Sequence, residues 1–98
     1  MNTIYFLAEI TCFETARQLF KFPIINSFRQ SIWFKDAISS TPSEIQLQGE
    51  NIEILKPCTV QIEIIDRGFL EGKIEIGKEF TLGTYPILMA SGKILTFL

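Results

Sequence analysis

The residue types that carry most enzyme chemistry are scarce in this chain of 98 residues. It contains no histidine, so the usual general base, the commonest metal ligand and the side chain that titrates near neutral pH are all missing. Cys58 is a candidate nucleophile, but no imidazole is present to activate its thiol, and we interpret it as a small buried turn residue. We therefore expect a protein that is not an enzyme and needs neither cofactor nor metal.

Four glutamates in the second half of the chain are candidates for a pair of catalytic acids. They are Glu63, Glu71, Glu75 and Glu79. A catalytic acid needs an apolar pocket to raise its pKa, whereas these residues alternate with isoleucine. The alternation is typical of the solvated face of a strand.

Three other residues are candidates for binding a partner: Arg29, Trp33 and Tyr85. Arg29 and Trp33 fall on the hydrophilic face of one predicted strand, an arrangement common in interfaces and in base stacking. The alternative is that Trp33 covers the end of a barrel and Arg29 pairs with a nearby carboxylate. Tyr85 precedes a proline, so we expect it in an exposed turn where it anchors a partner or, alternatively, plugs the barrel mouth.

The composition predicts one small globular domain that spans residues 1–98. Hydrophobic residues make up 47% of the chain and charged residues 20%, which is enough apolar material for one core. The net charge is −2 and Lys and Arg do not cluster, so charge alone gives poor support for nucleic-acid binding. We expect no secretory leader, because Glu9 interrupts the opening apolar run, and we expect reduced cysteines in the cytoplasm.

Alternation of apolar and polar residues with period two runs through most of the chain. It predicts an all-β fold, a small antiparallel barrel of about six strands with turns near Gly68, Gly72 and Gly77. The final segment, 87–98, is nearly all apolar, as expected for a strand that is covered on both faces or closes a barrel. The other predicted strands are 4–12, 24–34, 45–48, 52–54, 60–64, 70–76 and 80–82, and the predicted loops are 14–21, with at most one helical turn, and 36–43.

Several of these segments fall in an order known from one protein family. Phe6-Leu7-Ala8-Glu9-Ile10 is followed by Arg29-Gln30-Ser31-Ile32-Trp33-Phe34, and Pro57-Cys58-Thr59-Val60 later opens a long alternating strand. Phe80-Thr81-Leu82 is then followed by Ala90-Ser91-Gly92 and Ile94-Leu95. In these features the chain resembles the C-terminal β-barrel domain of elongation factor Tu and related translational GTPases.

The resemblance implies a barrel that abuts other domains and holds the T-stem of aminoacyl-tRNA. In the family this contact uses the Gln of an Arg-Pro-Gln segment and a Glu-Gly-Gly-Arg turn. This chain has Ser31 in place of that Gln and Thr84-Tyr85-Pro86-Ile87 across the turn. It also contains no phosphate-binding loop, so we expect no GTP hydrolysis.

The sequence thus leaves two functions open. The first is a stand-alone binding module that contacts protein or RNA in the translation machinery, with a protein partner favoured over RNA. The second is a small immunity-type protein or inhibitor that caps a toxin or an enzyme. In either case an open strand edge would allow a homo-oligomer to form.

Overall fold

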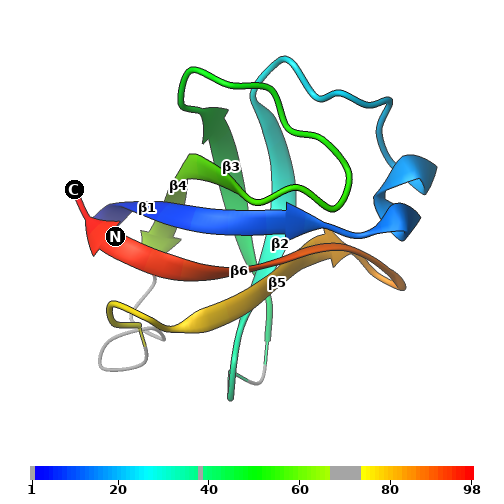
Figure 1. Cartoon of the computed structure of the whole chain (residues 1–98). Helices are drawn as coiled ribbons and strands as arrows, with labels where there is room; N and C mark the ends of the chain where they lie inside the picture. The colour runs from blue at the N-terminus through cyan, green and yellow to red at the C-terminus, as the bar shows by residue number, and fades with distance from the viewer. Residues whose placement is uncertain (1, 38, 67–73) are drawn as a thin grey trace.

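A computed structural model describes residues 2–37, 39–66 and 74–98, which form six β-strands closed into a barrel (Figure 1). Around the barrel the strands follow the order β1-β4-β3-β2-β5-β6, and every neighbouring pair is antiparallel. The strands are β1 (Asn2–Cys12), β2 (Phe28–Phe34), β3 (Thr41–Leu47), β4 (Cys58–Asp66), β5 (Glu79–Thr84) and β6 (Ile87–Phe97). The expected all-β fold, a small antiparallel barrel of six strands, is confirmed.

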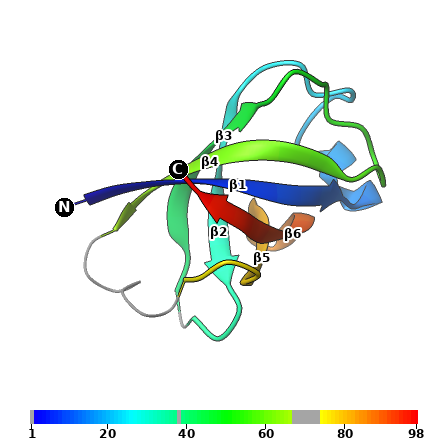
Figure 2. The ribbon, with the colours of Figure 1, turned by 60° about the vertical axis from the view of Figure 1, so that its left-hand side comes forward.

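The first and last strands lie side by side and close the barrel (Figure 2). Their register runs from Phe6 opposite Phe97 to Cys12 opposite Ala90. The prediction that segment 87–98 closes a barrel is therefore confirmed. The alternative, coverage on both faces, is wrong, because Leu88 and Leu95 of β6 are 47% and 36% exposed.

Inward side chains at alternate positions build the core. In β1 these are Phe6, Ala8, Ile10 and Cys12, all at most 1% exposed. The ring of Phe6 lies in the centre, with its centroid 6.2–6.3 Å from the rings of three other phenylalanines, which come from β2, β5 and β6. Burial of each such side chain contributes about 1.5–3 kcal/mol. The inward positions are thus committed to packing, and only outward ones are free to bind.

Gly92 allows β6 to pass close to this core. A Cβ atom at Gly92 would lie 2.6 Å from the carbonyl oxygen of Glu9 and 2.7 Å from Cζ of Phe80. Any side chain larger than a hydrogen atom would clash at such distances. Position 92 therefore requires glycine for β6 to approach β1 and Phe80 this closely.

The connection between β1 and β2 departs from the sequence prediction. It contains a short 3-10 helix, η1 (Glu14–Gln18), in the segment expected to hold at most one helical turn. The predicted strand 24–34 begins only at Phe28 in the structure. Before it, Ile24 forms an isolated bridge to Ile52 and is not part of the strand. The predicted strand 52–54 is likewise reduced to isolated bridges at its two isoleucines. Ile24, Ile52 and Ile54 thus pack from loops, although their alternation with polar residues in the sequence resembles that of a strand.

Two further predictions differ from the structure where residues are described. The predicted loop 36–43 is wrong in its second half, because β3 starts at Thr41. Pairing with β4 begins at Ser43, so Pro42 has a strand neighbour only on the β2 side, and a proline is tolerated at such an edge position. Of the predicted strand 70–76, residues 70–73 lie outside the described residues, as do Gly68 and Gly72, and residues 74–76 form no strand.

Candidate binding surfaces

Arg29 and Tyr85 come together on one side of the barrel. Arg29 lies on the outer face of β2 with its side chain 85% exposed, and Tyr85, in the turn between β5 and β6, is 86% exposed. The hydroxyl of Thr84 donates a hydrogen bond of 2.9 Å to Oε1 of Gln30. Because Gln30 follows Arg29 and Thr84 precedes Tyr85, this bond joins the two segments that carry the exposed side chains. We call these four residues the Arg29–Tyr85 surface.

A hollow of about 430 Å³ adjoins the Arg29–Tyr85 surface and is acidic on balance. Its wall contains Glu44 of β3 directly opposite Glu63 of β4. Arg29 pairs with Glu44, with 3.6 Å between Nε and Oε2, and is the only basic residue in the lining among the residues that the structure describes. Like charges in directly opposite positions destabilise a sheet. The hollow is therefore suited to receive a basic group and unsuited to a phosphate.

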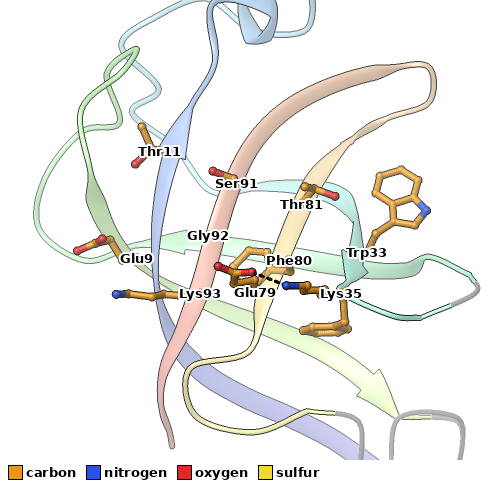
Figure 3. Close-up of a pocket in the computed structure, with 11 residues that line it drawn as sticks. Glu9, Thr11, Trp33, Lys35, Glu79, Phe80, Thr81, Ser91, Gly92 and Lys93 are labelled. Carbon is orange, nitrogen blue, oxygen red and sulfur yellow. Dashed lines mark hydrogen bonds and ion pairs between the residues drawn. The ribbon is translucent and has the colours of Figure 1, made fainter.

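A second hollow, the Trp33 groove, lies on the outer face of β1, β6, β5 and β2 and has a volume of about 570 Å³ (Figure 3). Trp33 is half-buried at its rim, next to Thr81 in the register of β2 and β5. Ser91 and Thr11 continue this uncharged row across β6 and β1. The short side chains of Thr81 and Ser91 on the two middle strands leave the space that forms the groove.

Beside the uncharged row runs a row of four charges. Lys93 of β6 lies between Glu9 of β1 and Glu79 of β5 in the register of these strands. Lys35 completes the row, because its backbone N–H donates to the carbonyl of Glu79 at 2.9 Å and its Nζ lies 3.4 Å from Oε2 of the same residue (Figure 3). Both partners of this ion pair are well exposed, so its contribution to stability is small. The groove as a whole carries no net charge.

The structure thus separates the three residues predicted to bind a partner. Arg29 and Tyr85 lie on two segments joined by the Thr84–Gln30 hydrogen bond, whereas Trp33 lines the other hollow, and the linings of the two hollows share no residue. Arg29 also makes the carboxylate pair of the alternative interpretation. Tyr85 does not plug the barrel mouth, since it is 86% exposed, and Trp33 lies on the outer wall. The part that these residues play in binding stays a prediction.

Residues that complete these surfaces were not apparent from the sequence. Thr84 and Gln30 are 54 positions apart, and Glu79 and Lys35 are 44 apart. Their proximity depends on strand register, which neither residue type nor spacing reveals.

The two cysteine thiols are buried inside the barrel and are poor nucleophiles. Cys12 is 0% exposed and Cys58, the first residue of β4, is 4% exposed. Burial is the largest cause that raises the pKa of each thiol to about 11, and Glu50 adds to the effect at Cys58. Both thiols are therefore protonated at neutral pH.

The candidate acids do not form a pair of catalytic acids among the described residues. Glu63 lies on the outer face of β4, Glu75 is exposed in the segment 74–78 before β5, and Glu79 pairs with Lys35. Glu71 lies outside the described residues.

No family model matches this chain, and no curated protein matches it. In the described ranges there is also no helix long and apolar enough to cross a bilayer. The closed six-stranded barrel and the geometry of its two outer hollows are the observations from which function has to be argued.

Proposed function

We propose that this protein is a non-catalytic binding module that docks a protein partner on the Arg29–Tyr85 surface. The observation that carries the proposal is the exposure of Arg29 and Tyr85 beside the Thr84–Gln30 hydrogen bond. Arg and Tyr are among the residues that contribute most binding energy in protein interfaces. Neither side chain is needed for the core, and the hydrogen bond restrains the backbone that presents them.

The charge of the surface favours a protein over RNA. Within the described ranges, Arg29 is the one basic residue at the hollow, and Glu44 and Glu63 lie in the same wall. Binding to a phosphate backbone needs several clustered cations, which this wall does not provide. A protein partner that inserts a lysine or arginine would instead relieve the repulsion between the two glutamates.

The proposal includes the resemblance to the C-terminal barrel domain of elongation factor Tu. In that family, the segment corresponding to Arg29–Phe34 and the turn corresponding to 84–87 hold tRNA. Here the same two segments meet through Thr84 and Gln30. We infer that the chain uses the corresponding face of the barrel for a partner of different chemistry.

A second candidate function is an immunity-type protein or inhibitor. The acidic hollow supports it, because a basic side chain of a toxin or nuclease would fit opposite Glu44 and Glu63. Both candidates use the same surface and differ only in the identity of the partner.

The test is a quantitative pull-down from cells of the native host. The bait is the wild-type chain, the variant R29A/Y85A or the control K56A, which removes an exposed charge elsewhere. Loss of two interface anchors should lower recovery of a specific partner by about tenfold or more, while K56A leaves it unchanged. Circular dichroism should show all three chains folded, because these side chains lie outside the core.

The partner's identity separates the two candidates: a translation component supports the first, and a toxin or nuclease supports the second. Recovery that disappears after ribonuclease treatment would show that RNA is the ligand. Recovery of the same proteins by R29A/Y85A and wild type would contradict the proposed surface.

A further inference from the structure

The charges of the Trp33 groove alternate in sign across four adjacent positions. From β1 to β2 the row reads Glu9, Lys93, Glu79, Lys35, or minus, plus, minus, plus (Figure 3). Adjacent strands lie about 4.8 Å apart, so the four charges form an evenly spaced line across the sheet. The alternation also gives each lysine a glutamate neighbour within the same chain. Such pairing explains why opposite charges lie side by side, but it does not explain why the row is complementary to a second copy of itself.

An alternating row of even length is complementary to itself. A twofold axis parallel to the strands places a second copy face to face and reverses the order of the row. Glu9 then faces Lys35 of the second copy, and Lys93 faces Glu79 of the second copy. Each contact occurs twice, as in any isologous interface. A twofold axis along the row would instead set every charge against its own kind, so the pattern selects one arrangement over the other.

The uncharged row supports the same arrangement. Under the twofold axis parallel to the strands, Trp33 faces Thr11 of the second copy, and Thr81 faces Ser91. Between Trp33 and Thr11 the row holds only the short side chains of Thr81 and Ser91, within a hollow whose total volume is about 570 Å³. The indole of each copy can therefore enter the space above the other's hydroxyl row. Tryptophan is enriched in the centres of protein interfaces.

We propose that the Trp33 groove binds a second copy of this chain about a twofold axis parallel to its strands. The groove has no net charge, so it offers no attraction to a polyanion or a polycation. The contact face is small and largely polar, which places the dimer among weak, salt-sensitive associations. The Arg29–Tyr85 surface shares no lining residue with the groove, and the inference does not depend on the proposed function.

Trp33 is the only tryptophan of the chain and reports directly on the groove. Sedimentation velocity and tryptophan emission are measured together from about 10 μM to about 1 mM, in low and in high salt. We expect the sedimentation coefficient to rise and the emission maximum to shift to shorter wavelength over the same concentration range. High salt should weaken the association by about tenfold or more.

Charge variants test the pairing. K35E/K93E makes the whole row acidic and should abolish association, whereas K21E/K56E changes net charge equally on exposed residues outside the groove and should retain it. Reversal of all four charges in E9K/K35E/E79K/K93E preserves every neighbour contact within the chain and restores complementarity to its own copies. This reversed chain should associate with itself about as strongly as the wild type does, which sedimentation velocity measures.

Three results would overturn the inference. One is a wild-type chain that stays monomeric with an unchanged emission spectrum up to about 1 mM. Another is association of K35E/K93E as strong as that of K21E/K56E. The third is a reversed chain that stays monomeric under conditions where the wild type associates, because its row has the same complementarity to itself.

Discussion

Replacement of Gly92 by alanine would place a methyl group where the barrel has no room for it. The added carbon would lie 2.6 Å from the carbonyl oxygen of Glu9, 2.7 Å from Cζ of Phe80 and 2.8 Å from Cγ2 of Ile10. The two side chains can rotate, but the carbonyl oxygen belongs to β1, which pairs with β6 at this point. The strands β1 and β6 must therefore separate locally, where they close the barrel.

The expected cost follows from these contacts. Overpacking a core typically destabilises a protein by about 1–3 kcal/mol, and a contact with backbone places this site at the upper end. Alanine also restricts the unfolded chain, which offsets about 0.4–1 kcal/mol. A net loss of about 2–3 kcal/mol corresponds to a fall in melting temperature of about 8–24 °C for a domain of this size.

Urea denaturation followed by circular dichroism measures this loss, with Ser91→Ala as the control. Ser91 points outward from the next position, so its replacement should change the free energy of unfolding by less than about 0.5 kcal/mol. The double variant G92A/F80L removes one of the contacts and should recover only part of the loss. A G92A protein within about 0.5 kcal/mol of the wild type would refute the reasoning.

Three more predictions concern the interior. Phe6→Ala should cost about 3–5 kcal/mol in urea denaturation, because it empties the centre of the aromatic cluster; a loss under 1 kcal/mol would contradict that packing. Ser43→Ala removes the donor of a 2.7 Å hydrogen bond to the carbonyl of Gln30 and should cost about 1 kcal/mol by the same assay. The pKa of the Cys12 thiol is raised from 9.0 to about 11, so the folded state holds its proton longer, and stability should fall as pH rises between these values. The loss is on the order of 3 kcal/mol, and Cys12→Ala should make the profile less steep, with Cys58 accounting for the slope that is left; equal slopes in both proteins would exclude the Cys12 thiol as a cause.

The barrel could be predicted because one face of each strand is buried. In β1 and β4, apolar residues recur at every second position, and the structure places these residues inside. The same rule failed where burial has another origin. Ser43 is polar but buried, because its hydroxyl donates a hydrogen bond to a backbone carbonyl. The sequence pattern predicts a loop at this position, whereas the structure has the strand β3. Ile24 and Ile52 are apolar and buried, yet each forms only an isolated bridge.

Candidate binding residues could be found by type but not placed by sequence. Arg29 and Trp33 lie four residues apart on the same face of β2, but they line different hollows. The hollow at Arg29 is completed by β3 and β4, and the hollow at Trp33 is completed by β5, β6 and β1. Tyr85 reaches Arg29 only through the register that joins β2 to β5. Register follows from how the whole barrel closes, and local patterns do not contain it.

Closure also determines where association can occur. The strands of a closed barrel pair on both sides, so little backbone is left for the edge pairing expected from the sequence. We therefore place self-association on the outer face, where the charge row supplies the specificity that edge hydrogen bonds would have given. If the Trp33 groove joins two copies, the dimer carries two Arg29–Tyr85 surfaces. Such a dimer would hold a partner with repeated sites more tightly than one copy, so disruption of the groove by K35E/K93E should weaken multivalent binding while leaving the affinity of a single site unchanged.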